Sequence, residues 1–169
     1  MTPSSTDRAH AGGPLAGVKV LDLSAYIAGP YGCTLLADQG AEVLKIEPPE
    51  GDNLRTYPST LAGESRAFVG VNRGKRSVCI DLRNEQGRET FLRLAEKADV
   101  VMENFTPGTM GALGLGYDVL NARNPRLVYA ATSGFGQTGP ERDRPALDVI
   151  VQGMGGIMSI TGEPGGPPV

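Results

Sequence analysis

The sequence predicts an α/β fold in which helices cover both faces of a mostly parallel sheet. Short aliphatic segments alternate with segments of helical periodicity along most of the chain. This alternation is typical of parallel strands joined by crossover helices. The strand segments are apolar along their length, as expected for strands that are buried on both faces. At 169 residues, the chain is long enough to bury a core.

Five segments are predicted to be strands because they are short, aliphatic and bounded by glycine, proline or polar residues. They are residues 18–23, 41–46, 77–82, 100–102 and 127–131. Ligands of parallel sheets bind beyond the carboxyl ends of the strands. We therefore expect function in the loops after the first, third, fourth and fifth strands.

Four helices are expected, over residues 30–40, 84–97, 117–123 and 146–160. Pro30 suits a first helical position, Gly40 a C-terminal cap and Asn84 an N-cap. The last helix is weakened by glycines at positions 153, 155 and 156. Residues 47–74 are expected to form a long irregular excursion, which in a compact domain is usually functional.

Composition argues against several classes of protein. The 16 Lys and Arg are outnumbered by 19 Asp and Glu, which gives a formal net charge of −3 and no basic block of the kind that nucleic-acid binders carry. No apolar segment approaches the roughly 20 residues of a membrane span. Residues 1–13 are expected to be a disordered tail, and they lack the apolar region of a secretory signal. We therefore expect a cytoplasmic protein that binds neither nucleic acid nor membrane.

Residues that hold metals or form disulfides are scarce. Cys33 and Cys79 lie inside apolar segments without metal-ligand spacing, so we expect both to be buried hydrophobic residues in a reducing compartment. The only histidine, His10, lies in the polar tail, which argues against catalysis by histidine. No metal site is expected.

Residues 134–139 match the glycine-rich fingerprint of dinucleotide-binding proteins, but their context is wrong. The fingerprint must open a helix and normally lies after the first strand. Here it follows the fifth predicted strand and precedes residues 140–145, which contain two prolines and four charged residues. A mobile glycine-rich loop explains the pattern better, and NAD binding is rejected. The glycosylation sequon at residues 104–106 is attributed to chance because nothing indicates secretion.

Three loops carry candidate binding residues. Residues 24–32 lead into a helix N-terminus whose free N–H groups suit an anion or a carbonyl oxygen, although a plain tight turn explains them equally well. A basic turn places Arg73, Lys75 and Arg76 beside a glycine, which fits either a solvated surface or a phosphorylated ligand. Residues 104–108 combine an Asn amide with an aromatic ring, which suits an amphipathic ligand.

Segments spread over nearly the whole chain resemble the class III CoA-transferase family, also called the CaiB/BaiF group. The family includes formyl-CoA and carnitine CoA-transferases as well as α-methylacyl-CoA racemases. The matching segments are residues 15–23, 28–30, 40–47, 72–77, 103–105, 124–129 and 133–140. They occur in the right order and spacing from Pro14 to about Pro168.

The resemblance implies a Rossmann-like large domain followed by a small domain, in an intertwined homodimer. Family members are much longer, so residues 14–169 would be the N-terminal part of an incomplete large domain. The family's nucleophilic aspartate follows a stretch similar to residues 161–169, and we expect it just beyond Val169. It attacks an acyl-CoA thioester and forms an aspartyl anhydride, and a carboxylic acid finally receives CoA. The 169-residue chain alone should therefore be inactive and poorly stable.

The resemblance also implies which residues contact coenzyme A, which is a substrate and not a permanently bound cofactor. One loop would line the thioester, and two further segments would hold the nucleotide and the pantetheine arm. The thioester residues are Ala25, Tyr26, Ile27 and Ala28, and the others are Asn72, Arg73, Lys75, Arg76, Asn104, Phe105 and Thr106. One transferase subgroup has Gln at the position of Ile27, so the acyl acceptor stays undetermined.

Asp148 occupies a position that is acidic across much of the family. As a functional residue it would orient the reacting group or bind CoA, and otherwise it caps the helix that begins beside it; the functional interpretation is favoured. Racemase members carry a catalytic histidine where Leu147 stands, and leucine cannot exchange a proton. A CoA-transferase is therefore favoured over an acyl-CoA racemase or epimerase, and over a non-catalytic CoA-binding or dimerisation module.

Overall fold

A computed structural model describes residues 12–60, 63 and 65–168 of the chain. The chain forms two compact units, Met1–Thr132 and Ser133–Val169, and each is described by itself. The predicted tail, residues 1–13, lies outside the described residues except for its last two glycines.

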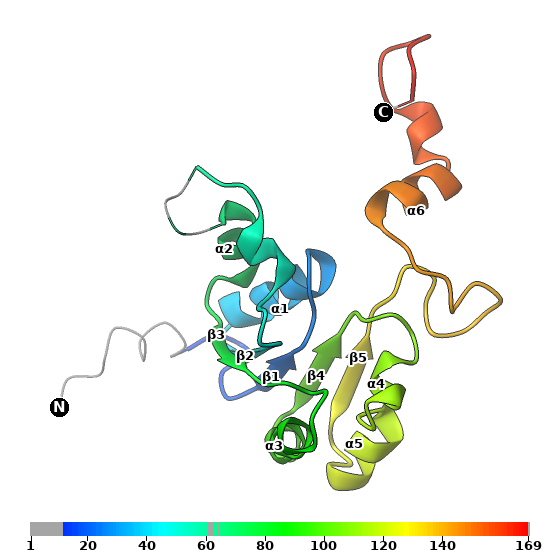
Figure 1. The fold of residues 1–169 in the computed structure, drawn as a ribbon. Helices are drawn as coiled ribbons and strands as arrows, with labels where there is room; N and C mark the ends of the chain where they lie inside the picture. The colour runs from blue at the N-terminus through cyan, green and yellow to red at the C-terminus, as the bar shows by residue number, and fades with distance from the viewer. Residues whose placement is uncertain (1–11, 61–62, 64, 169) are drawn as a thin grey trace. The chain divides into compact units, whose positions relative to one another are not determined.

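The first unit is built on a five-stranded sheet in which every neighbouring pair of strands is parallel (Figure 1). Its strands are β1 (Lys19–Asp22), β2 (Glu42–Glu47), β3 (Arg76–Cys79), β4 (Val100–Glu103) and β5 (Val128–Ala131). The five predicted strands are confirmed, although the third ends at Cys79 instead of Leu82. The predicted fold class, an α/β fold around a parallel sheet, is confirmed as well.

The strand order is β3-β2-β1-β4-β5, so β1 lies at the centre and the chain builds the sheet outward from it on both sides. Val20 of β1 is paired with Val43 of β2 on one side and with Val100 of β4 on the other. Where the strand order of a parallel sheet reverses, a crevice forms outside the carboxyl ends of the two central strands. Here those strands are β1 and β4, so the loops that follow them are placed to form a site.

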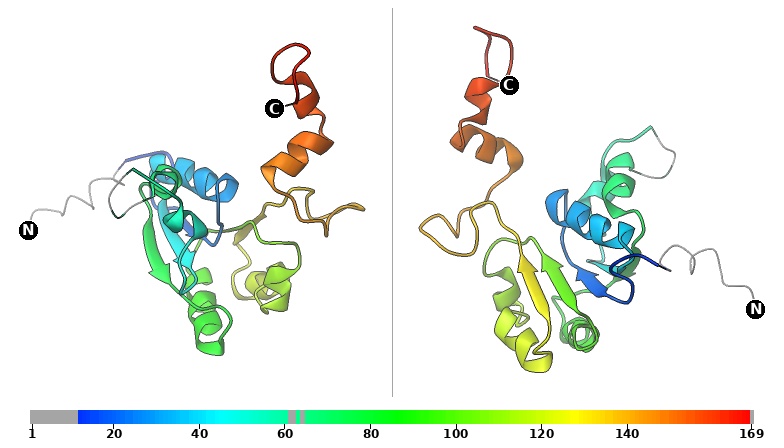
Figure 2. Two further views of the ribbon diagram at one scale, coloured as in Figure 1. Left: turned by 45° about the horizontal axis from the view of Figure 1, so that its top comes forward. Right: turned by 180° about the vertical axis from the view of Figure 1, so that it is seen from behind.

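Helices cover both faces of this sheet (Figure 2). The first, α1 (Ala28–Asp38), packs on the face that carries Val20. On the other face, α3 (Glu85–Ala95) and α5 (Tyr117–Arg123) pack on the neighbouring strand residue Leu21. Because successive strand residues point to opposite faces, one apolar strand supplies both cores.

The helices predicted in the first unit are confirmed with small shifts. α1 begins at Ala28, two residues before Pro30, and ends before Gly40, whose φ of 99° lies in the left-handed region that favours glycine. Asn84 caps α3, and its side chain accepts a hydrogen bond from the N–H of Gly87 at 2.7 Å.

The expectation that residues 47–74 are irregular is wrong. A 3-10 helix, η1 (Asn53–Thr56), and an α-helix, α2 (Arg66–Asn72), occupy part of this excursion. They begin after the capping side chains of Asp52 and Ser65, respectively, each of which accepts a hydrogen bond from the first turn. Both helices are too short for an apolar periodicity to stand out in the sequence.

The second unit contains two short helices, α6 (Asp148–Met154) and η2 (Ile157–Ile160), where one helix over residues 146–160 was expected. Gly156 separates them with a φ of 78°, a conformation that glycine adopts most readily. Neither helix buries a residue. The exposed apolar side chains are Leu147, Val149, Ile150, Val151, Met154, Ile157 and Ile160.

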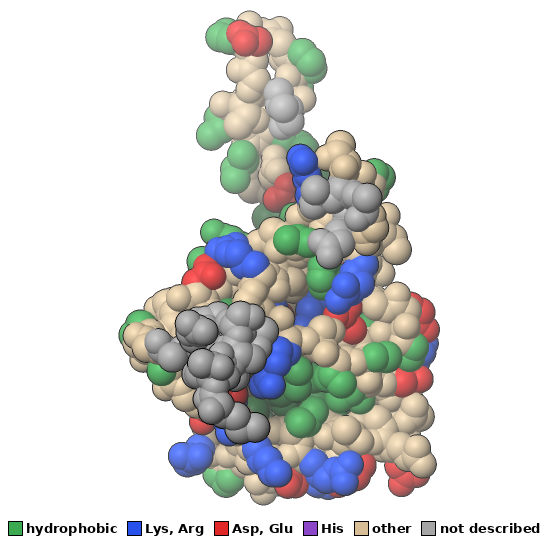
Figure 3. Space-filling view, turned by 90° about the vertical axis from the view of Figure 1, so that its left-hand side faces the viewer, with side chains coloured by type: hydrophobic (Ala, Val, Ile, Leu, Met, Phe, Trp, Pro, Cys, Tyr) green, Lys and Arg blue, Asp and Glu red, His purple; other side chains and the backbone are tan. Residues whose placement is uncertain are grey.

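Figure 3 shows one face of the molecule, on which hydrophobic side chains reach the surface between positively charged Lys and Arg and negatively charged Asp and Glu side chains.

Among the residues that the structure describes, no helix combines the length and the apolar character that crossing a membrane requires.

The two cysteines differ in their surroundings. Cys33 is on the buried face of α1 as expected, whereas Cys79 is exposed because β3 lies at the edge of the sheet. The expectation of burial is therefore wrong for Cys79. Burial raises the pKa of the Cys33 thiol to about 12, and the nearby Asp22 carboxylate adds to the rise. The Cys33 thiol thus stays protonated and does not act as a nucleophile.

Two neighbouring positions on α5 test how this helix packs on the sheet. Leu120 is 0% exposed and Val119 is 41% exposed. Leu120→Ala should lower the free energy of unfolding by about 2–5 kcal/mol because it leaves a cavity, whereas Val119→Ala should change it by no more than about 0.5 kcal/mol. Urea denaturation followed by circular dichroism measures both losses. Equal losses would contradict the face of α5 that we assign to the core.

Candidate functional site

The loop after β1 is held by the loop after β4. The Asn104 side chain bridges the backbone of Ala25: its Oδ1 accepts a hydrogen bond from Ala25 N, and its Nδ2 donates one to Ala25 O, both at 2.8 Å. Two of the predicted segments therefore meet where the strand order reverses. The Asn104 amide, which we expected to contact a ligand, makes both of these bonds to the protein.

Beyond Ala25, the loop exposes its next residues. Tyr26 and Ile27 are 44% and 64% exposed. Tyr26 has a φ of 61°, which is uncommon for a bulky side chain, and its hydroxyl group accepts a hydrogen bond from Asn53 Nδ2 at 3.1 Å. Within the described part of the chain, no side chain caps the start of α1. The first N–H groups of this helix are therefore available to an anion or a carbonyl oxygen.

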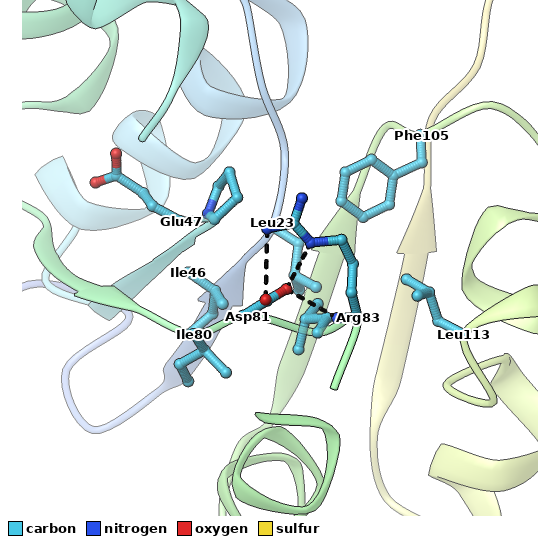
Figure 4. A pocket seen from close by; sticks show the side chains of 10 residues that line it. Leu23, Ile46, Glu47, Ile80, Asp81, Arg83, Phe105 and Leu113 are labelled. Carbon is cyan, nitrogen blue, oxygen red and sulfur yellow. Dashed lines mark hydrogen bonds and ion pairs between the residues drawn. The ribbon is translucent and has the colours of Figure 1, made fainter. Parts of the chain in front are cut away.

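An apolar pocket of about 170 Å³ lies at the carboxyl ends of the strands (Figure 4). Its walls come from residues at or after the ends of β1, β2, β3 and β4, and from one residue after the short helix α4 (Thr109–Ala112). They are Leu23, Ile46, Glu47, Pro48, Ile80, Asp81, Leu82, Arg83, Phe105 and Leu113. Figure 4 shows the Phe105 ring and Leu113 across the pocket from Ile46 and Ile80. Apolar walls with an aromatic ring suit a flat organic group.

Charged side chains stand at the rim of this pocket. The Arg83 guanidinium pairs with Asp81 at 2.8 Å and with Glu50 at 3.0 Å. Hydrogen bonds to these two carboxylates raise the pKa of Arg83, so the guanidinium stays charged. Exposed ion pairs contribute little to stability, so a phosphate group can replace a carboxylate as the partner of Arg83. The two carboxylates outnumber the one guanidinium, so an anion binds at this rim only through the Arg83 N–H donors that they leave free.

Glu103, at the end of β4, fixes the backbone of Phe105 in the pocket wall. Its Oε2 accepts a hydrogen bond from Phe105 N at 2.8 Å, and its Oε1 accepts one from the Tyr129 hydroxyl at 3.1 Å. Burial raises the pKa of the Glu103 carboxyl, and the two hydrogen bonds oppose this only in part. Burial and the Glu103 charge in turn raise the pKa of Tyr129, which therefore stays a hydrogen-bond donor.

Two residues of the basic turn, Arg73 and Arg76, pair away from these loops, whereas Lys75 contacts the end of β1 and Pro30. Arg76 is the first residue of β3, so the turn precedes the amino end of a strand, whereas the loops that form the site follow carboxyl ends. Arg73 pairs with Asp38 at the C-terminal end of α1, and the Arg76 guanidinium lies 3.7 Å from the Glu42 carboxylate at the start of β2. The structure thus does not bring Arg73 and Arg76 together with the loop after β4.

Lys75 points inward, in contrast to its two basic neighbours. Its side chain is 2% exposed, and its ammonium group donates to Asp22 Oδ2, Pro30 O and Asn72 Oδ1 at 2.7, 2.7 and 2.9 Å. An ammonium group has three hydrogen-bond donors, and all three are used here. Burial lowers the pKa of Lys75, although the Asp22 charge opposes this. The expected contact between Lys75 and a CoA phosphate therefore lacks a donor.

Of the remaining predicted residues, Asn72 is buried and accepts a hydrogen bond from Lys75, and Ala28, Thr106 and Asp148 are exposed. Ala28 begins α1, and Thr106 lies in the loop after β4. Asp148 lies in the first turn of α6, in the second unit, where Leu147 is the N-cap. Asp148 therefore does not cap the helix, and its Oδ2 accepts a hydrogen bond from Gln152 Nε2.

Asp81 and Arg83, which place charges at the pocket rim, were not among the predicted site residues. Both follow the third strand, which is one of the positions where we expected function. Their position was the available signal, because the pair matches no motif. Within the described residues, no group of three or more His, Cys, Asp or Glu side chains is arranged to hold a metal ion.

Comparison with known proteins identifies the family. The family model of CoA-transferase family III matches residues 15–169, which is nearly the whole chain. The chain belongs to CoA-transferase family III. The predicted resemblance is thereby confirmed.

Individual members of CoA-transferase family III are close in sequence and in fold. The chain is 50% identical over 166 residues to an acetyl-CoA:oxalate CoA-transferase from Acetobacter aceti, which covers 98% of the chain and 43% of the relative. It is 47% identical over 165 residues to a succinyl-CoA:mesaconate CoA-transferase from Haloarcula hispanica, over 92% of the chain and 42% of the relative. The crystal structure of a CaiB/BaiF family protein from Brucella suis superimposes with a TM-score of 0.88 at 46% identity, over 93% and 43% of the two chains. The chain thus spans about two-fifths of the length of these relatives.

In this member of CoA-transferase family III, Glu47 links the pocket wall to the excursion after β2. Its carboxylate accepts hydrogen bonds from Arg55 Nε and Arg55 Nη2, both at 2.7 Å. It also accepts one from Asp52 N at 2.9 Å and one from Ser77 Oγ. Burial acts to raise the pKa of Glu47, but the hydrogen bonds outweigh it and lower the pKa from 4.5 to about 2. The ionised carboxylate therefore stabilises the fold above pH 4.5, and this contribution is lost as the pH falls from 4.5 toward 2.

The titration of Glu47 tests this arrangement directly. We expect a midpoint near pH 2 for its carboxyl carbon in an NMR titration. Arg55→Gln should raise the pKa toward the ordinary value, because the charged donor is lost while burial and the hydrogen bonds from Ser77 and Asp52 N remain. Arg123→Gln on α5, which removes exposed pairs with Glu89 and Glu96, is the control and should leave Glu47 unchanged. An ordinary Glu47 pKa in the unsubstituted protein would contradict the hydrogen-bond network.

Proposed function

We propose that the chain is the N-terminal part of an enzyme that transfers CoA from an acyl-CoA thioester to a carboxylic acid. The observation that carries this proposal is the match to CoA-transferase family III over residues 15–169. Relatives named as acetyl-CoA:oxalate and succinyl-CoA:mesaconate CoA-transferases support the reaction type. Because these relatives differ in donor and acceptor, the proposal is limited to acyl-CoA esters and carboxylic acids as substrate classes.

The proposed reaction uses an aspartate that we place just beyond Val169. Its carboxylate attacks the thioester carbonyl, which gives an acyl-aspartyl anhydride and the CoA thiolate. The acceptor acid then takes the place of the first acid, and the thiolate returns to form the new thioester. Asp148 is retained as an auxiliary group that orients the reacting acid or binds CoA.

The loop after β1 would serve the thioester carbonyl. Each attack on this carbonyl develops negative charge on its oxygen, and fixed N–H donors stabilise such charge. The backbone N–H groups that follow Tyr26, those of Ile27 and Ala28 at the start of α1, supply these donors. The two Asn104 hydrogen bonds to Ala25 fix the chain just before them. Because Ile27 has no polar side chain, this contact would rest on the backbone alone.

The pocket at the carboxyl ends of the strands would take the nucleotide of CoA. Its apolar walls and the Phe105 ring suit an adenine base, and Arg83 at the rim suits a phosphate. Arg83 thus replaces the basic turn as the phosphate contact that we propose. Thr106 and Asn104 lie next to Phe105 in the chain and remain candidates for the pantetheine arm.

We further propose that the full-length protein works in the cytoplasm as an intertwined homodimer and binds no nucleic acid and no membrane. The family's fold, as the sequence resemblance implies it, supports the dimer. The apolar side chains that the second unit exposes, among them Ile157 and Ile160, are consistent with coverage by further polypeptide.

The reaction itself is tested with the full-length protein. Isotope-labelled acetyl-CoA or succinyl-CoA is offered with a panel of mono- and dicarboxylic acids, and mass spectrometry follows the products. We expect CoA to appear on at least one acceptor acid, with the donor acid released in equal amount. Exchange of deuterium at the acyl α-carbon without any CoA transfer would instead identify a racemase and overturn the proposal.

The nucleotide site is tested by calorimetric titration of the full-length protein with CoA. Arg83→Gln should weaken binding about tenfold, since a charged hydrogen bond contributes roughly 1.5–3 kcal/mol and part of it is screened at an exposed site. Arg93→Gln, near the far end of α3, is the matched control and should bind as the unsubstituted protein does. If Arg73→Gln/Arg76→Gln binds CoA more weakly and Arg83→Gln binds it unchanged, the basic turn and not Arg83 contacts the CoA phosphates.

A further inference from the structure

Two buried lysines lie beneath the loop after β1, and the proposed reaction uses neither. The side chains of Lys45 and Lys75 are each 2% exposed. Lysine is almost never buried without a partner, because removing an ammonium group from water is costly. Their partners therefore show what these lysines hold in place.

Lys45 ties the loop after β1 to the excursion after β2. Its ammonium group donates to the backbone oxygen of Ser24 at 2.8 Å and lies 2.8 Å from Asp52 Oδ2. This Asp52 oxygen has no other partner among the described residues. The other oxygen of Asp52 caps η1 and accepts a hydrogen bond from Leu54 N at 2.8 Å.

Asp22 carries the second link. It is 0% exposed, and its Oδ1 accepts hydrogen bonds from Ser24 N, at 3.0 Å, and from Ser24 Oγ. Its Oδ2 accepts one from Lys75, which also donates to Pro30 O in α1. The backbone N–H, the backbone oxygen and the hydroxyl group of Ser24 are therefore all engaged by charged groups.

These bonds determine the backbone just before the left-handed residue Tyr26. Ser24 is fixed by Asp22 and Lys45, and Ala25 is fixed by Asn104. A bulky residue keeps a φ of 61° only where its surroundings impose it. The N–H groups that follow Tyr26 at the start of α1 take their direction from this turn.

We propose that Lys45 and Asp22 are positioning residues, which act through Ser24 to aim the N–H groups after Tyr26 at the reacting thioester. This inference rests on the proposed function, because the loop must line the thioester for its direction to affect the rate. Neither side chain touches the substrate. Their loss should therefore lower kcat and leave the binding of the CoA ester almost unchanged.

The test compares variants of the full-length protein. Lys45→Met/Asp52→Asn removes both buried charges together, so no uncompensated ion is left, and the amide oxygen introduced at position 52 still caps η1. Asn124→Ala is the matched control, because the Asn124 amide is buried, donates to Ala95 O and Ala98 O at 3.0 and 2.8 Å, and does not contact the loop. Thermal unfolding establishes whether the two variants lose comparable stability.

Steady-state kinetics and hydrogen exchange supply the readouts. For Lys45→Met/Asp52→Asn, we expect kcat to fall on the order of 10²-fold, because misplaced donors cost that much, while KM for the acyl-CoA stays within about twofold. The peptide that contains the Ala25 N–H should exchange faster. In Asn124→Ala, kcat, KM and the exchange of this peptide should match the unsubstituted protein.

Each outcome decides the inference. An unsubstituted protein without CoA-transferase activity overturns the proposed function, whereas an active protein whose double variant keeps its kcat overturns the positioning role alone. A parallel loss of kcat in Asn124→Ala would also overturn it, because general destabilisation would then explain the effect. If the double variant does not fold, Ser24→Ala, which removes only the hydroxyl bond to Asp22, takes its place. An unchanged kcat in Ser24→Ala contradicts the inference, and a several-fold fall with constant KM supports it.

Discussion

A single buried carboxylate at the carboxyl end of the central strand organises the first unit. Asp22 is fully buried, and a buried charge without a partner costs several kcal/mol. It therefore requires the Lys75 ammonium group and the polar groups of Ser24. Because Lys75 precedes β3 and also donates to Pro30 O, this requirement draws β3, β1 and α1 together. The loop after β1 acquires its shape as a consequence.

The sheet topology determines where the loops of the site lie, and polar and charged side chains determine their conformation. The reversal of strand order places the loops after β1 and β4 beside each other, whatever their sequences. Topology does not fix the conformation of those loops, since they lack regular hydrogen bonds. Here side-chain hydrogen bonds fix the loop backbone instead. Asn104 and Lys45 bind the backbone of the loop after β1, and Glu103 binds the backbone N–H of Phe105 in the pocket wall.

The sequence predicts what depends on local pattern and misses what depends on side-chain direction. Strands such as β4 and the Asn84 cap of α3 follow from apolar runs and capping chemistry, and both are confirmed. Arg73, Lys75 and Arg76 look equivalent in the sequence, yet Lys75 alone points inward, toward Asp22. Asp22 lies 53 positions away in the sequence, so the local pattern around Lys75 gives no sign of this contact. The pocket around Arg83 draws on five separate chain segments, so no single stretch could indicate it.

The buried charges also bear on why this arrangement exists. Replacing a buried ion pair by well-packed apolar side chains is often neutral or even stabilising. Stability alone therefore gives no reason to keep Lys45 and Asp52 beneath the loop after β1. Apolar side chains would fill the same space, but they could not donate a hydrogen bond to the backbone oxygen of Ser24. The charged pair instead fixes the orientation of the Ser24 backbone. This backbone lies at the carboxyl end of the sheet, where we place the reacting thioester.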